Sequence, residues 1–220
     1  MVRLIRFLWR FFKGAVAALV IVVLVSLMIP VELGYGEQHQ YPTLPNGCEA
    51  VSASVALNGL GVPIHAETFA SQYLPKAAIG TTSPKDAYQG DPFGNGYYCY
   101  PQPLVTGINN FLAIQNTSLE AKTHKLVSVS EIVLRLHAKK PVIVWLTVDD
   151  KLASRDRSVV WQTGARDYHP YKNLHVMVVD GVKGGKVHLV DSVNGSRWMS
   201  LAKFLPLYYS MGLRAVYFTD

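Results

Sequence analysis

The sequence predicts an α+β domain that follows a single membrane-spanning helix. After residue 45, helical patterns come first and strand patterns later, an order typical of α+β folds. Residues 14–31 carry no charged side chain, and at about 1.5 Å of rise per residue such a helix spans most of the ~30 Å apolar layer of a bilayer. The 220 residues leave room for one ordinary domain besides this segment.

Charge is distributed asymmetrically around the apolar segment. Four basic residues precede it, and the first acidic residue of the chain is Glu32. The positive-inside rule then places the N-terminus in the cytoplasm and everything after Val31 outside the cell membrane. A cleavable signal peptide is the alternative, and it also exports the domain. We expect a basic cytoplasmic segment, a membrane anchor, a linker and a folded domain, at residues 1–13, 14–31, 32–45 and 46–220.

The net charge of +6 does not indicate nucleic-acid binding. Four of the 21 Lys and Arg residues precede the apolar segment, which leaves 17 against 15 Asp and Glu in the rest of the chain. No basic run with interleaved aromatic residues follows, so we expect no nucleic-acid partner. No His, Cys or Asp group has metal-ligand spacing, and we expect neither a metal nor a cofactor.

The helices are predicted from apolar spacing and from the residues that end them. The turn at Asn46-Gly47 precedes a helix at 48–58, which ends at Gly59. Further helices are predicted at 66–74, 104–114, 130–140 with Ser130 as N-cap, and 200–205. Residues 77–103 are rich in Gly, Pro and Tyr and predict a long loop, which is typical of a functional segment.

The strands fall in the second half of the chain. Residues 141–148 are apolar and β-branched on both faces, as in a central strand. Residues 174–182 and 186–193 flank Lys183-Gly184-Gly185 and predict a hairpin, and 213–219 predicts a last strand.

Cys48 lies where a nucleophilic thiol is favoured. Unpaired backbone N–H groups and the dipole at a helix start lower the pKa of a thiol. The Cys48 N–H and a side-chain amide upstream would hold a developing oxyanion, and the amide is that of Gln40 or, alternatively, Gln38. A disulfide with Cys99, the other cysteine, is the structural alternative.

Among seven histidines, His175 opens a strand after an irregular segment, as expected at the edge of a cleft. If residues 183–185 form a three-residue loop, Asp191 faces Met177, and His175 and Asp191 are diagonal neighbours. A two-residue loop would place them on opposite faces. The same register sets Asp180 opposite His188, which is the rival pair.

Residues 44–61, which include Pro45-Asn-Gly-Cys-Glu49 near their start, resemble the nucleophile motif of bacterial papain-like peptidases related to the bacteriocin-leader (double-glycine) processing domain. Three further segments are similar to this family in order and spacing. They are Asp91–Tyr98, Leu174–Gly181 and Val187–Ser192. The resemblance covers residues 38–219; it departs from the family at Asp191-Ser192, where Asp-Pro is frequent, and in the longer spacing from Gln40 to Cys48.

The resemblance implies a papain-like fold with an N-terminal helical part and a C-terminal antiparallel sheet. It implies Cys48 as nucleophile, His175 as general base, Asp191 as the residue that orients it and Gln40 as oxyanion donor. We expect a membrane-anchored extracytoplasmic cysteine peptidase acting on a peptide or protein, secreted if the N-terminal segment is cleaved. The alternatives are a non-catalytic surface binding or assembly module, and a thiol acyltransferase or cell-wall amidase.

Overall fold

The computed structural model describes residues 9, 12–14, 29–163 and 167–220. Its helices and strands, in chain order, are β1 (Val31–Glu32), α2 (Cys48–Gly59), α3 (Ala66–Gln72), β2 (Lys76–Ala77), β3 (Tyr88–Gln89), α4 (Pro101–Leu112), β4 (Glu120–Lys122), α5 (Val129–His137), β5 (Val142–Thr147), β6 (Leu174–Lys183), β7 (Lys186–Val190), β8 (Arg197–Ser200), α6 (Leu201–Ser210) and β9 (Ala215–Thr219).

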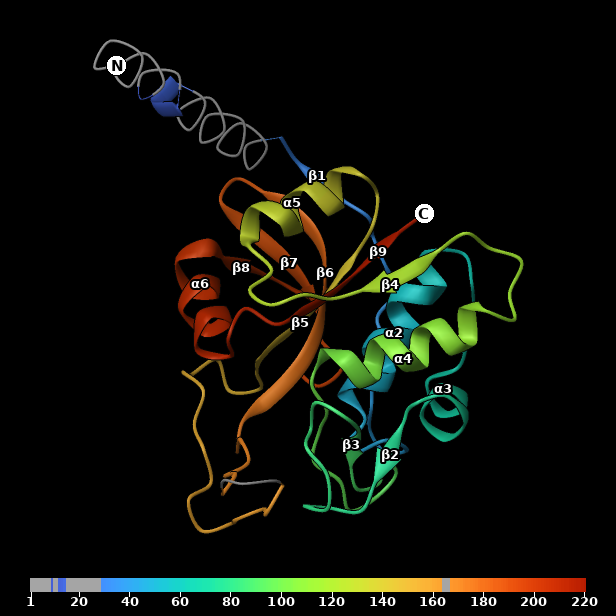
Figure 1. The fold of residues 1–220 in the computed structure, drawn as a ribbon. Coiled ribbons are helices and arrows are strands. Elements are labelled where there is room, and N and C mark those ends of the chain that lie inside the picture. Colours follow the sequence, from blue (N-terminus) through green and yellow to red (C-terminus); the bar gives the residue numbers. More distant parts are fainter. Residues whose placement is uncertain (1–8, 10–11, 15–28, 164–166) are drawn as a thin grey trace, which may run out of the picture.

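One antiparallel sheet organises the molecule. Its strand order is β4-β9-β5-β6-β7-β8, and the short β1 pairs with the end of β6. Helices α2, α3 and α4 lie on one side of this sheet, and α5 and α6 lie on the other (Figure 1). The expected α+β class with an antiparallel sheet is confirmed.

Alternation along the central strand β5 builds a separate core on each face. Ile143 and Trp145 pack toward α2 and α4, whereas Val142 and Val144 pack toward α5 and α6. Every residue of β5 is buried, because both faces of the sheet are covered. The apolar run of this segment therefore predicts a central strand correctly.

The predicted membrane segment at 14–31 lies mostly outside the described residues. Within the described ranges, no helix combines the length and the apolar character needed to cross a bilayer. Val31 pairs with Val182 of β6, and Leu33 N–H donates to the Asp180 carbonyl at 2.8 Å. Residues 32–45, which we expect to form a linker, thus pack on the domain, and Leu44 is buried within it.

Several predicted bounds change for local reasons. Helix α4 begins at Pro101, three residues before the predicted start, because proline is tolerated in the first turn where no N–H partner is needed. The N-cap of α5 is Ser128 and not Ser130, since Ser128 Oγ accepts from Glu131 N–H at 3.2 Å. Helix α6 extends well beyond the predicted Leu205. The short strands β1, β2, β3, β4 and β8 are absent from the sequence prediction, and β3 lies within the segment predicted as a loop.

The β6–β7 hairpin has a two-residue loop, so the expected three-residue loop is wrong. Lys183 pairs with Lys186, and Gly184 and Gly185 have φ values of +54° and +74°, which glycine adopts without strain. A β-bulge at Asp180 then shifts the register, because Gly181 pairs with His188 but Val179 pairs with Leu189.

Candidate active site

A tight turn positions Cys48 at the first residue of α2. A Cβ atom added to Gly47 would lie 2.7 Å from Leu44 Cβ, so the close turn requires glycine. The predicted loop around residue 94 supports this turn from outside. Asn46 Nδ2 donates to the Gly94 carbonyl at 2.6 Å, and the Tyr88 hydroxyl donates to the Asn46 carbonyl at 2.5 Å.

The start of α2 contacts β6 at a place that β7 does not reach. The β6–β7 ladder ends at the pair Val178–Val190, which leaves the polar backbone groups of Val176 without a partner on β7. Ser52 Oγ donates to the Val176 carbonyl at 3.1 Å, and the Val176 N–H lies against the Cys48 thiol. Cys48 is thereby held beside the residue that follows His175.

His175 and Asp191 form a buried pair. Imidazole Nε2 lies 2.7 Å from Asp191 Oδ1, and the side chains are 4% and 0% exposed. The two-residue loop shifts the pairing of β6 with β7 by one residue, and the bulge at Asp180 reverses this shift. His175 and Asp191 therefore share a face, as predicted. The other nitrogen of the His175 ring, Nδ1, has no hydrogen bond within the described part of the chain.

Arg197 completes the surroundings of Asp191. Its guanidinium bonds Asp191 Oδ2 at 2.5 Å, and the Val193 N–H donates to Oδ1 at 2.9 Å. Burial alone would raise the pKa of Asp191, but the hydrogen bond and charge of His175 together with Arg197 hold that pKa well below its usual range. The carboxylate is therefore ionised and fixed.

The Cys48 thiol does not have the lowered pKa that its place at a helix start predicts. The thiol donates a hydrogen bond to Glu49 Oε2 at 3.2 Å, and no imidazole nitrogen is hydrogen-bonded to it within the described residues. Burial, followed by the Glu49 carboxylate, raises the pKa of Cys48 well above its usual value. The pKa expectation is wrong, because it omits the burial of the thiol and, after it, the carboxylate of the next residue.

Glu49 is fully buried, and each of its carboxyl oxygens accepts a hydrogen bond. Its Oε1 accepts from the Cys99 N–H at 2.8 Å, while Oε2 accepts from the Cys48 thiol. Burial raises the pKa of Glu49 to about 7. Trp145 Nε1 donates to the Cys99 carbonyl at 2.8 Å, so both polar backbone groups of Cys99 are hydrogen-bonded.

Gln40 connects the segment before Cys48 with the residue that follows Asp191. Its Nε2 donates to the Pro45 carbonyl at 2.8 Å, and its Oε1 accepts from Ser192 Oγ at 2.8 Å. Gln38 instead accepts from Ser54, six residues along α2 from Cys48. The Cys48 N–H has no hydrogen-bond acceptor within the described ranges, so it is available to a substrate oxygen.

The rival pair also forms, but elsewhere. His188 Nδ1 lies 2.6 Å from Asp180 Oδ1 beyond the bulge, and Tyr35 N–H donates to the other oxygen of this carboxylate. Neither residue has a hydrogen bond to a cysteine. Cys48 and Cys99 are both free and buried, so the alternative disulfide is absent. Across the described ranges, no group of three or more acidic, His or Cys residues could hold a metal ion.

Sequence reasoning missed Glu49 and Arg197 as parts of this site. Glu49 belongs to the Pro45–Glu49 signature, and its position next to the nucleophile was the available signal. Arg197 lies in a short strand without a clear pattern, and only the fold brings it to Asp191.

The model of a protein family described as "Peptidase_C39 like family" matches residues 32–216. The chain belongs to this family. It is therefore a papain-like cysteine peptidase, and the resemblance noted in the sequence is confirmed. No curated protein matches the sequence significantly.

Among solved structures, a C39-like peptidase from Bacillus anthracis is similar with a TM-score of 0.74 and 21% identity, covering 87% of this chain and 98% of the other. This likeness supports the fold of the Peptidase_C39 like family. A double-glycine motif protease of an AMS/PCAT transporter, solved with its leader peptide, gives a TM-score of 0.46 at 14% identity, with coverage of 86% and 94%. Xylellain, a cysteine protease from Xylella fastidiosa, gives 0.42 at 12% identity, with coverage of 89% and 87%.

Proposed function

We propose that this member of the Peptidase_C39 like family hydrolyses peptide bonds with Cys48 as nucleophile and His175 as general base. Asp191 orients the imidazole, and the Cys48 N–H together with Gln40 Nε2 stabilises the oxyanion. The observation that carries the proposal is the buried His175–Asp191 pair on the strand segment against which Cys48 is docked.

The reaction begins from a neutral thiol. For attack, the Cys48 side chain turns from Glu49 toward His175, and the thiol proton passes to imidazole Nδ1. The thiolate then forms a bond to the substrate carbonyl carbon, and the protonated imidazole returns the proton to the departing amine. Water, deprotonated by the same ring, hydrolyses the acyl-enzyme and regenerates the thiol. Asp191 keeps the ring in the tautomer that has a free Nδ1.

Labelling of the thiol with an iodoacetamide probe tests this assignment. We expect labelling of the wild type, none at residue 48 of Cys48→Ala, and labelling of His175→Ala slowed by at least about tenfold. Two matched controls are present in the chain. Cys99→Ala removes the other buried thiol, and His124→Ala breaks a surface His–Glu pair away from the site; both should keep the wild-type rate at Cys48.

Equal labelling of the wild type and His175→Ala would contradict the catalytic pair. Mass analysis of products from a peptide pool and from peptidoglycan distinguishes peptide hydrolysis from the two alternative thiol reactions, acyl transfer and cell-wall amide cleavage. A non-catalytic binding module would give no product from either substrate.

We also propose that the peptidase acts outside the cytoplasm, attached to the membrane by residues 14–31. The support is the uncharged segment with four basic residues before it. Fractionation of cells, followed by protease treatment of intact cells, tests the proposal. The protein should stay in the membrane pellet and be degraded from outside; recovery in the cytoplasmic fraction would overturn it.

A further inference from the structure

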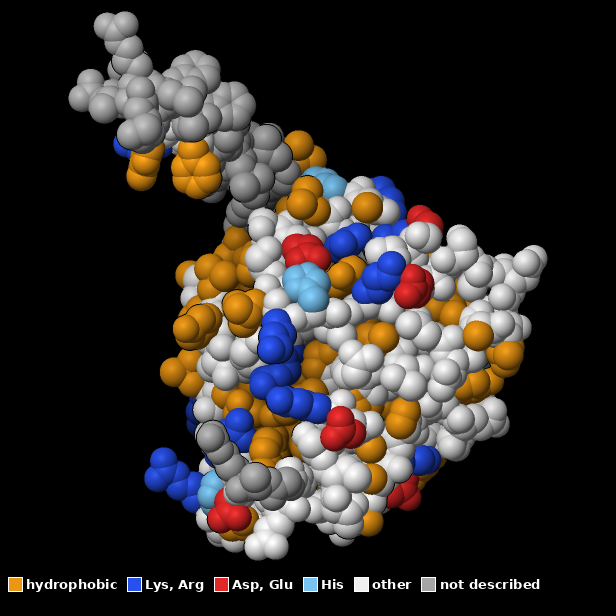
Figure 2. Space-filling model, viewed as in Figure 1, with side chains coloured by type: hydrophobic (Ala, Val, Ile, Leu, Met, Phe, Trp, Pro, Cys, Tyr) orange, Lys and Arg blue, Asp and Glu red, His pale blue; other side chains and the backbone are white. Residues whose placement is uncertain are grey.

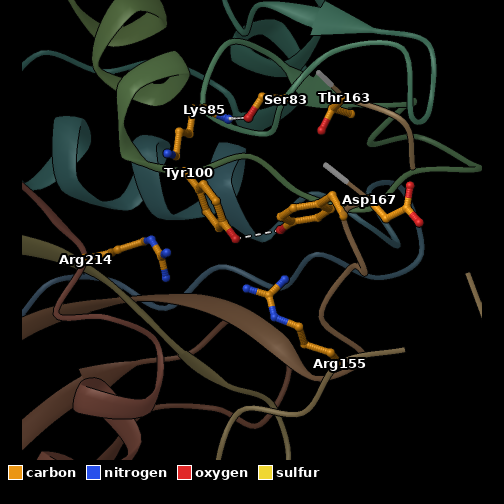
Figure 3. A pocket seen from close by; sticks show the side chains of 8 residues that line it. Ser83, Lys85, Tyr100, Arg155, Thr163, Asp167 and Arg214 are labelled. Carbon is orange, nitrogen blue, oxygen red and sulfur yellow. Dashed lines mark hydrogen bonds between the residues drawn. The ribbon is translucent and has the colours of Figure 1, made fainter. Parts of the chain in front are cut away.

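A pocket of about 470 Å³ lies between the loop that precedes α4 and the loop between β5 and β6 (Figure 3). Three of its lining residues are basic and one, Asp167, is acidic; Lys85, Arg155 and Asp167 are exposed, and Arg214 is partly buried. Its lining consists of Ser83, Lys85, Tyr100, Arg155, Thr163, Asp167, Tyr168 and Arg214.

The three cations of this pocket have no acidic partner. Lys85, Arg155 and Arg214 form no ion pair with any carboxylate of the described residues. An adjoining pocket of about 650 Å³ shares Lys85 and Arg214 and adds Lys125 together with the acidic Asp86. Lys and Arg side chains accordingly form a band across this face of the molecule (Figure 2). Such a cluster attracts anions.

Aromatic rings hold the two arginines in place. The Arg214 guanidinium lies 4.1 Å from the centre of the Tyr100 ring, and the Arg155 guanidinium lies 4.0 Å from that of Tyr171. Arg155 also donates to the Tyr171 hydroxyl and to the His169 carbonyl. Cations held in this way lose little conformational entropy when they bind a ligand.

The pocket walls continue into the segments that carry the proposed catalytic residues. Tyr100 follows Cys99, whose N–H is bonded to Glu49 beside the nucleophile. The Tyr100 hydroxyl is hydrogen-bonded to the Tyr168 hydroxyl at 2.6 Å. Tyr171 leads into β6, where His175 lies. The walls of the pocket are therefore continuous along the chain with the residues beside Cys48 and His175.

We propose that this pocket binds an acidic side chain of the peptide substrate. The proposal rests on the proposed peptidase function and extends it to the substrate class. Two observations favour a Glu or Asp side chain. The cations surround a cavity sized for one or two side chains, and the tyrosine hydroxyls at its wall add hydrogen-bonding groups for a carboxylate.

Binding without turnover tests the pocket directly. The full-length chain carrying Cys48→Ala is titrated into a fluorescent octapeptide with a central Glu-Glu pair, and into the same peptide with Gln-Gln, with anisotropy as readout. We expect the Glu peptide to bind at least about tenfold more tightly, and Arg155→Gln or Arg214→Gln to weaken it by about tenfold. Arg157→Gln, an exposed arginine of the same loop outside the pocket, should leave binding unchanged.

The melting temperature of each variant shows whether it is folded. A folded Arg155→Gln or Arg214→Gln protein that binds the Glu peptide as tightly as the parent would overturn the proposal. The proposal would also be overturned if inorganic polyphosphate bound through these residues and the Glu peptide did not, since the pocket would then be a polyanion site.

Cleavage of a proteome-derived peptide library separates the two proposals. Products of the enzyme with intact Cys48 should show an acidic residue at one fixed distance from the cut, and this preference should disappear in Arg155→Gln. Cleavage without an acidic preference would overturn the pocket proposal alone. Tight binding of the Glu peptide without any cleavage would leave the pocket standing and overturn the peptidase function.

Discussion

Cys48 and Glu49 are consecutive residues whose side chains share a hydrogen bond inside the protein. Burial disfavours a charge on the sulfur, and the carboxylate beside it opposes a second negative charge; together they explain the direction of the Cys48 pKa shift. Burial and Glu49 thus keep the sulfur neutral in the substrate-free enzyme, and the helix start alone does not ionise it. Formation of the thiolate requires the proton acceptor that we assign to His175.

Replacement of Glu49 by Gln should lower the pKa of the Cys48 thiol. Gln removes the negative charge, its carbonyl can still accept from the Cys99 N–H, and its amide can donate to a thiolate. The rate of alkylation by iodoacetamide as a function of pH measures the shift. We expect the midpoint to move to lower pH.

Glu67→Gln is the matched control for this change. Glu67 occupies the second residue of α3 as Glu49 does of α2, but it is exposed. Its replacement should leave the midpoint where it is in the wild type. A midpoint in Glu49→Gln equal to or above that of the wild type would show that the carboxyl does not keep the thiol neutral.

At the scale of single elements, the β-bulge in β6 decides which side chains come together in the site. The bulge at Asp180 changes the face of the sheet to which the following side chains of β6 point. Val178 packs toward α2, whereas Val182 packs toward α5 and α6. Without it, the two-residue loop would place His175 and Asp191 on opposite faces. Asp180 itself is bonded to His188 and Tyr35, which stabilises the bulge.

The docking of α2 on β6 depends on Ser52. Ser52→Ala would leave the Val176 carbonyl buried without its hydrogen bond, which costs about 1–3 kcal/mol. We expect the melting temperature to fall by about 2–4 °C for each kcal/mol. We also expect faster alkylation of Cys48, because the helix start is held less firmly.

Ser71→Ala serves as the control in thermal unfolding. Ser71 is exposed, and its hydroxyl bonds only carbonyls of its own helix, at Glu67 and Thr68. Its loss should change stability by no more than about 0.5 kcal/mol. Equal melting temperatures for Ser52→Ala and the wild type would mean that the Ser52 hydrogen bond does not hold α2 in place.

At the scale of the whole molecule, two buried carboxyl groups give stability opposite dependences on pH. The pKa of Glu49 is raised from 4.5 to about 7 in the folded state, so its contribution is complete below its unfolded pKa and is lost as the pH rises toward 7. The pKa of Asp191 is lowered, so its contribution is present above its unfolded pKa and is lost as the pH falls below about 4.

The melting temperature should therefore be highest near about pH 4–5 and decline on both sides. Glu49→Gln should flatten the decline between about pH 5 and 7, because Gln does not titrate, while Glu67→Gln should leave the profile of the wild type. Differential scanning calorimetry across this range measures the effect. An unchanged profile in Glu49→Gln would show that another group causes the alkaline decline.

The sequence by itself determined the features that depend on nearby residues. The turn at Gly47, the helix that starts at Cys48, the apolar central strand at Val142–Thr147 and the hairpin at Gly184-Gly185 follow from local sterics and side-chain periodicity. The choice of His175 and Asp191 followed from their spacing around that hairpin together with the family signature. The loop length assumed for it was nevertheless wrong.

Only the tertiary structure decided the features that depend on contacts between distant segments. The bulge at Asp180 is stabilised by partners from other strands and from the segment before α2. The shift of the Cys48 pKa comes from burial among elements far apart in the chain, which a local pattern does not contain. The loop before α4, the loop after β5 and Arg214 in the segment before β9 meet to form the basic pocket, and none of them alone has the charge or the shape of a binding site.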